Sequence, residues 1–407
     1  MRSALFILLI FLSTSAIGQI SYTVSARLVD NDTQDPLVYA SVFIKGRKIS
    51  TISNSQGFFD FHVPQNALND TLVVSMLGYR NFTTITSALV NDPNSTIQLE
   101  RDVIVLEEVV ISDTLTPGDI VRIALNKIVL NFPMEPYGME GFYRDLKTVD
   151  GQYVSLLEAA LQIFDKGYKD PRNPIKLKER VSINEIRKSI GYDKISIKWF
   201  DQTNLLEDLL LHNNVKYRTF PREEIFFQVL QLQGYTAFNG KPVYIIGYDD
   251  EYSLRVFVEM GSYSIVRVEF EIGDGESPIR VDKKNKKKAN EIMRIKRILE
   301  FQEYGGKNYL QYLNVETETV WKNYKNNKVL ANTKLFQELL VNKIETEDYE
   351  MISSAQKMKS FGLQYQDKPY NSDFWKSYNV IKDSPLEEAV VKDLEIRMPL
   401  EQQFEKN

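Results

Sequence analysis

The chain has 407 residues, of which 43% are hydrophobic, so it is long enough for two or three domains with cores of their own. Its 50 basic and 55 acidic residues give a net charge of −5, which provides no basic field for nucleic acid, and we expect no nucleic-acid partner. The lack of cysteine and the presence of only two histidines, His62 and His212, exclude disulfides, thiol nucleophiles and most transition-metal sites. We therefore expect neither a metal nor a cofactor.

Residues 1–19 have the composition of a secretory signal peptide. Arg2 precedes the apolar run 4–12, and small residues follow. Ala16 and Gly18 stand where a signal peptidase requires small side chains before its cleavage point. The apolar run is too short to span a bilayer as a helix, and no later stretch is long enough. We expect an exported protein, periplasmic, associated with the outer membrane or secreted, with no transmembrane segment in the mature chain.

Short alternating runs separated by turn residues fill the segment 20–112, a pattern typical of an all-β sandwich. Strands are expected within residues 22–29, 40–46, 57–61 and 71–76. The turn at residues 53–57 ends in Gly57, for which we expect a positive φ.

Four blocks of this segment follow one another in the order and spacing of a known family. They are Leu28-Val29-Asp30, residues 35–42 (DPLVYASV), residues 53–59 (SNSQGFF) and residues 75–79 (SMLGY). The series resembles the carboxypeptidase-D regulatory-like family, common in Bacteroidetes envelope proteins. Where that family usually has Thr-Asp before the turn glycine, this chain has Ser53-Asn54. The resemblance implies a transthyretin-like or Ig-like β-sandwich with a structural or binding role.

A linker at residues 113–135 is predicted to hold one helix, from about Pro117 to Leu130. Thr116 is a suitable N-cap, and Asp119 can complete a capping box with it. The apolar residues of this stretch share one face; they are Ile120, Val121, Ala124, Leu125 and Ile128. The helix is expected to end before Pro133.

Residues 136–407 are predicted to form an antiparallel-sheet domain, so the fold class is mainly β with an α+β second part. Strands are expected at residues 243–248, 254–259, 265–272, 292–304, 309–321 and 335–344. In the strand 265–272, Val266, Val268, Phe270 and Ile272 are expected on one buried face, with Arg267, Glu269 and Glu271 on the wet face. A helix at residues 202–212 is expected to bury Leu205, Leu206, Leu209 and Leu210.

This succession of long meander strands looks like the curved half-barrel of LolA/LolB-like lipoprotein carriers. The resemblance implies a concave face that binds a lipid, a peptide or a partner protein. Tyrosine, with 22 copies, could line such a groove, although half-buried positions in strands are its more ordinary place.

The strongest local charge feature is the basic run at residues 283–288. Its five lysines are Lys283, Lys284, Lys286, Lys287 and Lys288. They could contact an anionic membrane surface, at about 1 kcal/mol per basic residue. The run is short and lacks interleaved aromatic residues, which favours the alternative of a solvated hairpin loop.

Two acidic turns, at residues 30–35 and 249–251, have oxygen ligands that suit calcium. Neither turn has the glycine and the distal glutamate of the helix-loop-helix calcium motif, so solvated β-turns are favoured.

No catalytic motif is present: the chain has no nucleophile elbow, zinc-binding helix, phosphate loop or dinucleotide fingerprint. We therefore expect a non-catalytic envelope protein with a binding or scaffold role. The alternative is a hydrolase of envelope glycans or peptides that uses carboxylates such as Glu158 or Asp165. A polar cleft with two facing acids about 5 to 9 Å apart would favour the hydrolase. A hydrophobic hollow without paired carboxylates would favour binding.

Overall fold

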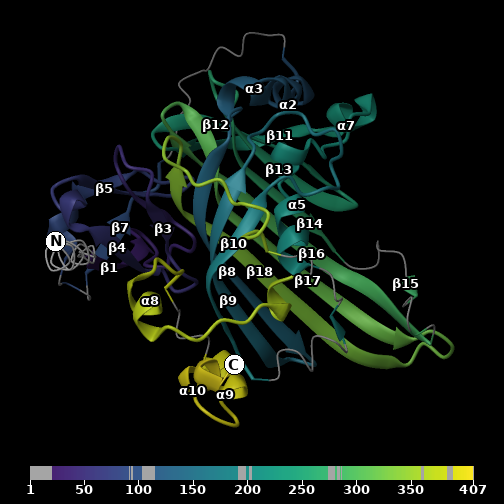
Figure 1. Ribbon diagram of the computed structural model, residues 1–407. Coiled ribbons are helices and arrows are strands. Elements are labelled where there is room, and N and C mark those ends of the chain that lie inside the picture. Colours follow the sequence, from purple (N-terminus) through teal and green to yellow (C-terminus); the bar gives the residue numbers. More distant parts are fainter. Residues whose placement is uncertain are drawn as a thin grey trace, which may run out of the picture.

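The computed structural model describes residues 21–90, 92, 95–102, 115–190, 199–200, 204–273, 280–281, 285, 287–358, 362–382 and 388–406. The predicted signal peptide at residues 1–19 therefore lies outside the described residues. Figure 1 shows a small β-rich part at the N-terminus beside a much larger twisted sheet. The fold is mainly β, as predicted, with short helices on both faces of the large sheet.

The N-terminal part consists of two small sheets. In one, β1 (Ser21–Asp30) lies between β4 (Phe58–Pro64) and β7 (Thr96–Leu99); in the other the order is β3 (Ser50–Ile52), β2 (Ser41–Ile44), β5 (Thr71–Ser75) and β6 (Phe82–Ile85). Two short 3-10 helices, η1 (Gln65–Ala67) and η2 (Thr86–Leu89), connect strands. Alternating residues such as Val24, Phe59 and Val42 are fully buried in one core. The sandwich and its four predicted strands are confirmed.

Gly57 occupies the turn before β4 because no other residue fits there. Its φ is +80°, and a Cβ at this position would lie 2.3 Å from the carbonyl oxygen of Leu28. The side chain of Asn54 holds the turn, since its Oδ1 accepts hydrogen bonds from the backbone N–H of Gln56 and of Phe58, both at 2.9 Å.

The predicted linker helix is present as two consecutive helices, α2 (Pro117–Asn126) and α3 (Ile128–Asn131). The predicted capping box is confirmed: the backbone N–H of Asp119 donates to Thr116 Oγ1 at 3.1 Å, and the backbone N–H of Thr116 donates to the Asp119 carboxylate at 3.0 Å. The expectation of one continuous helix differs from the structure at Lys127, whose ψ of 2° interrupts the α-helical backbone.

The large sheet has eleven strands, and all its paired strands are antiparallel. They are β8 (Tyr137–Val149), β9 (Gln152–Asp165), β10 (Arg180–Lys188), β11 (Gln231–Phe238), β12 (Lys241–Asp249), β13 (Tyr252–Glu259), β14 (Ile265–Ile272), β15 (Arg280–Val281), β16 (Lys288–Tyr304), β17 (Lys307–Asn323) and β18 (Val329–Glu345). The order is β10-β9-β8-β18-β17-β16-β14-β13-β12-β11, with β15 on β16. The predicted strands are confirmed, and the pairing of β8 with β18 joins two meanders into one sheet.

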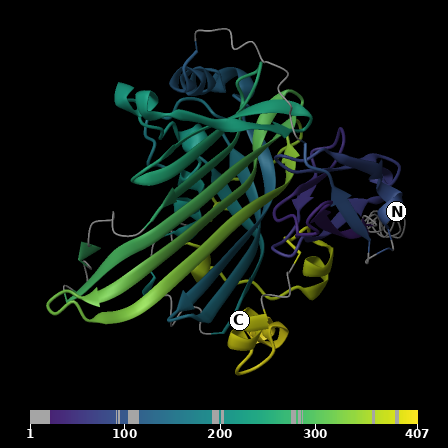
Figure 2. The same cartoon turned by 180° about the vertical axis from the view of Figure 1, so that it is seen from behind.

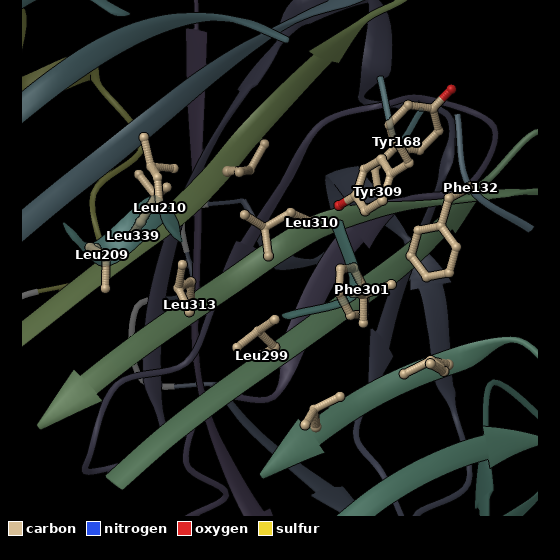
Figure 3. Close-up of a cluster of buried hydrophobic side chains, with 14 of the residues drawn as sticks. Phe132, Tyr168, Leu209, Leu210, Leu299, Phe301, Tyr309, Leu310, Leu313 and Leu339 are labelled. Carbon is tan, nitrogen blue, oxygen red and sulfur yellow. The ribbon is translucent and has the colours of Figure 1, made fainter. Parts of the chain in front are cut away.

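One face of this sheet, here called the inner face, packs against helices. These are α2, α3, α5 (Leu205–Leu211), α6 (Asn214–Tyr217) and α7 (Glu224–Val229). Figure 3 shows Leu209 and Leu210 of α5 beside Leu313 and Leu339 of the strands, and Phe132 beside Phe301. The four leucines predicted to point inward from α5 are all buried. Within the described part of the chain, none of the helices has the length and apolar composition needed to cross a bilayer.

A β-bulge in β14 changes which residues face the core. Phe257 pairs with Arg267 and Val258 pairs with Ile265, so Val266 is the extra residue. Val268 packs in the inner-face core, whereas Val266 packs with Phe257 on the opposite face. The prediction that Val266 and Val268 share one face is therefore wrong, because a bulge breaks the two-residue alternation.

The opposite face, here called the outer face, is covered by the sandwich and by the C-terminal segment. On this face the segment contributes α8 (Ser372–Ser377), α9 (Glu388–Leu394) and α10 (Leu400–Lys406). The preceding η3 (Leu363–Tyr365) instead packs through Leu363 in the inner-face core. Trp375 and Ile381 share a buried cluster with Ile52 of the sandwich and with Phe142 and Leu340 of the sheet. Figure 2, seen from behind, places the C-terminal helices next to both parts.

Asn379 joins the sandwich to the rest of the chain through hydrogen bonds on both sides. Its Oδ1 accepts from the backbone N–H of His62 at 2.7 Å, and its Nδ2 donates to the carbonyl of His62 at 3.1 Å. Its own carbonyl accepts from Asn342 Nδ2 of β18 at 2.5 Å. Nearby, Lys382 pairs with Asp60 at 2.8 Å. The C-terminal segment therefore connects the two β-rich parts.

Candidate functional site

A cleft of about 240 Å³ opens on the inner face, between the loop that joins α6 to α7 and the strands β13, β14 and β16. We call it the inner cleft. The sheet contributes Tyr252, Leu254, Val268, Phe270 and Arg297, and the helical side contributes Asn214, Thr219, Phe220, Pro221 and Phe226. Most of this lining is apolar or aromatic, and none of the described lining residues is acidic. Such a surface suits an apolar ligand held by a small number of polar groups.

Arg297 is the one charged residue among the described residues of this lining. Its guanidinium lies 4.8 Å from the centre of the Phe270 ring, in a cation–π contact. Its Nε is buried and has no hydrogen-bond partner among the described residues, and no acidic side chain there forms an ion pair with it. Burial lowers the pKa of Arg297, but an arginine stays protonated at neutral pH.

His212 is the C-cap residue of α5, and the positive charge of Arg297 affects its pKa. Burial, and then the nearby positive charge of Arg297, lower the pKa of His212 from its ordinary 6.5 to about 3. His212 is therefore neutral at neutral pH, and it adds no second positive charge beside the cleft.

The free energy of unfolding is expected to fall on acidification through the titration of His212. Between pH 6.5 and about 3 the unfolded chain binds a proton at His212 that the folded chain does not. The stability is thus intact above pH 6.5 and declines below it, by at most about 1.4 kcal/mol per pH unit from this group. Urea unfolding of His212→Asn across this range should show a smaller decline than the wild type. Equal slopes for the two proteins would contradict the assignment.

The first candidate hydrolytic carboxylate, Asp165, lies in a buried polar cluster on the inner face. Lys216 Nζ is 2.5 Å from the Asp165 carboxylate and 2.5 Å from that of Glu179. The hydroxyl of Tyr137 donates to Asp165 at 3.0 Å, and that of Tyr217 donates to Glu179. Burial, and the adjacent carboxylate in each case, raise the pKa of both tyrosines. This cluster ties α6 to β9 and to the start of β10.

The second candidate, Glu158, lies on the outer face between two arginines. Arg187 Nε is 2.5 Å from its carboxylate, and Arg144 lies 3.7 Å away while also contacting Glu338. The guanidinium of Arg187 in turn lies 4.5 Å from the ring centre of Trp375. Glu158 and Asp165 are seven residues apart on β9, an odd separation that places them on opposite faces of the sheet. The structure therefore does not bring these two acids together.

Of the five lysines in the basic run, Lys283, Lys284 and Lys286 lie outside the described residues. Lys287 is exposed next to the start of β16. The ammonium of Lys288 lies 4.2 Å from the ring centre of Trp199 and 5.2 Å from that of Trp321. Lys288 thus already has aromatic partners, and contact of this run with a membrane surface stays a prediction.

The two acidic turns are held by hydrogen bonds from the protein itself. The carboxylate of Asp30 accepts from the backbone N–H of Asp32 and Thr33, from the Tyr79 hydroxyl and from Arg101. The backbone and tyrosine hydrogen bonds hold the pKa of Asp30 well below its usual value. At the second turn Asp249 accepts from Gln233 and Ser253. No group of three or more potential metal-ligating side chains occurs among the residues that the structure describes.

The tyrosines play a smaller part in the cleft than a groove-lining role requires. Tyr252 lines the cleft, whereas Tyr143, Tyr168 and Tyr217 are buried in the core. Arg297 and Lys216 were missed by sequence analysis. Arginine in a strand and lysine in a short helix are usually solvent-exposed, so the sequence gives no signal for either residue. Only the folded structure shows that their side chains lie in buried surroundings.

The fold and the site define a mainly β protein in which a small sandwich is joined to a large antiparallel sheet with a cleft on its helix-covered face. Residues 24–111 match the family model of the CarboxypepD_reg-like domain. This match confirms the resemblance that the four sequence blocks indicate. A comparison with curated protein sequences finds no match.

Solved structures similar to the chain include a LolA superfamily protein from Nitrosomonas europaea, with 11% identity and a TM-score of 0.23 over 58% of this chain and 96% of that one. A DUF1329 family protein from Desulfovibrio piger has 11% identity and a TM-score of 0.25, over 59% and 98% of the two chains. The Pseudomonas aeruginosa MucA/MucB complex gives 9% identity and a TM-score of 0.18, over 57% and 99%. At TM-scores this low the similarity carries no argument about fold or function.

Proposed function

We propose that this chain is a non-catalytic binding protein of the cell envelope and that the inner cleft is its ligand site. The observation that carries the proposal is the chemistry of the cleft lining. Aromatic and aliphatic side chains from three strands and from the α6–α7 region surround a hollow of about 240 Å³, and no acid is among its described lining residues. A hydrophobic hollow without paired carboxylates favours binding over hydrolysis.

The positions of the candidate acids support the same proposal. Asp165 is paired with Lys216, and Glu158 is paired with Arg187 and Arg144, on opposite faces of β9. A carboxylate that is buried and ion-paired in this way is ordinarily structural. Acid–base hydrolysis of a glycoside needs two carboxyls that face each other across one pocket.

The envelope location rests on the sequence. Residues 1–19 have the pattern of a secretory signal peptide, and the sandwich matches a CarboxypepD_reg-like domain. In this proposal the sandwich is a scaffold on the outer face of the sheet, and the basic run near Lys287 is a secondary contact with an anionic surface.

Binding of a neutral apolar dye tests the cleft. Nile red is expected to bind the purified protein with an increase in fluorescence, and Thr219→Trp should weaken that binding by about tenfold or more by filling the hollow. Thr219 is exposed on a loop, so the larger side chain should not disturb the core. The matched control is Thr83→Trp on the exposed surface of the sandwich. Equal dye binding by both variants and the wild type would reject the cleft as the site.

A further inference from the structure

Arg297 carries a positive charge that the described part of the chain does not neutralise. Other arginines of the large sheet that are buried or half-buried have acidic partners: Arg144 pairs with Glu338, Arg187 with Glu158, and Arg267 with Glu300. The half-buried Arg297 lies over the face of Phe270, and its Nε is buried without a hydrogen-bond partner among the described residues. A buried charge without a counter-ion is costly, because nothing replaces the water that it loses.

The cleft places this charge at the edge of an apolar surface. Leu254, Val268 and Phe226 form the wall near Arg297, while Asn214 and Thr219 supply uncharged polar groups. His212 is neutral at neutral pH, and Arg297 is the one charged residue in the described lining of the cleft. The charge complement of this arrangement is one negative group attached to an apolar body.

We propose that the inner cleft binds a small amphiphilic carboxylate, such as a medium-chain fatty acid, with the carboxylate on Arg297 and the apolar tail against Leu254, Val268 and Phe226. This inference rests on the proposed function and adds the chemical class of the ligand. A guanidinium binds a carboxylate through two parallel hydrogen bonds, which a neutral alcohol cannot reproduce. The cleft has a volume of about 240 Å³, so it can enclose only a short part of the tail, or one end of a dye such as Nile red, while the rest lies outside.

The test compares octanoate with n-octanol as competitors of Nile red. For the wild type, octanoate should displace the dye at a concentration at least about tenfold lower than n-octanol, since hydrogen bonds between a guanidinium and a carboxylate are stronger than those of a neutral alcohol. Arg297→Met keeps an unbranched side chain on Phe270 but removes the charge. It should weaken octanoate by at least about tenfold more than it changes the binding of n-octanol or of Nile red, each measured on the same variant.

Arg255→Met is the matched control, because Arg255 lies on β13 of the same sheet, is half exposed and is outside the lining of the cleft. It should behave as the wild type with both competitors. Equal potency of octanoate and n-octanol in the wild type would overturn the carboxylate assignment and leave the binding function standing. Displacement of the dye by neither compound would also overturn it. Absence of Nile red binding to the wild type would instead reject the proposed function itself.

Discussion

Replacing Lys216 by methionine is expected to lower the free energy of unfolding by about 3 to 5 kcal/mol. The ammonium of Lys216 is fully buried and lies 2.5 Å from the carboxylates of both Asp165 and Glu179. Removal of this charge leaves two buried acids next to each other without a cation. Urea unfolding followed by circular dichroism measures the loss, and Lys216→Arg, which keeps the charge, should lose less.

The control for this substitution is Lys169→Met. Lys169 and its partner Glu135 are both largely exposed, and their ion pair is 3.4 Å long, so its removal should change the stability by less than about 1 kcal/mol. A loss for Lys216→Met no larger than that of the control would show that the buried cluster does not hold α6 to the sheet.

The contribution of Lys216 to the free energy of unfolding depends on pH in a direction that follows from the shift of its pKa. Burial by itself would lower the pKa of Lys216, but the two carboxylates raise it above the ordinary 10.5. Because the folded-state pKa is the higher one, the stabilisation is complete below pH 10.5 and is lost only as the pH rises further. Between about pH 6 and pH 9 the contribution of Lys216 to the stability of the wild type should therefore stay constant.

Trp375→Ala is expected to destabilise the protein by about 3 to 5 kcal/mol and to loosen the C-terminal segment from the outer face. Trp375 is 6% exposed, and its ring makes an edge-to-face contact with Phe142. The guanidinium of Arg187 lies over the same ring in a cation–π contact. Loss of the indole leaves a cavity between α8 and the sheet and removes a cation–π contact. Urea unfolding and limited proteolysis measure the two effects, and cleavage between residues 362 and 406 should become faster.

Lys376→Ala on the same helix is the matched control. The Lys376 side chain is exposed and pairs only with the exposed Asp373, so this variant should keep wild-type stability within about 0.5 kcal/mol. If Trp375→Ala were cleaved in the C-terminal segment no faster than Lys376→Ala, the anchoring role of Trp375 would have to be abandoned.

Much of the local structure could be predicted because it depends on neighbours in sequence. The turn at Gly57 needs a positive φ, and the capping box joins two residues, Thr116 and Asp119, within one helical turn. The four leucines of α5 follow the helical repeat. In β14 the two-residue alternation of apolar side chains did not predict the face of Val266, because a bulge lies there and no local sequence pattern marks it.

Neither the inner cleft nor the buried cluster of Lys216 could be predicted, because the residues of each meet only through long-range pairing. Lys216 comes from a short helix, Asp165 from β9 and Glu179 from the residue before β10, and nothing in their spacing indicates one cluster. The candidate acids Glu158 and Asp165 have the residue type that hydrolysis needs. Their pairing with Arg187 and Lys216 is a property of the folded chain, and it points to a structural role.

Sequence alone therefore determined the mainly β class, the sandwich with its family resemblance, the linker helix and the hairpin strands, since each of these depends on the period of apolar residues and on turn chemistry. The tertiary structure decided the pairing of β8 with β18, the packing of the C-terminal segment on the outer face, and which charged side chains form ion pairs. The physical reason is that the free energy of a buried charge depends on all the groups around it. Arg297 differs from Arg187 only in the neighbours that the fold provides.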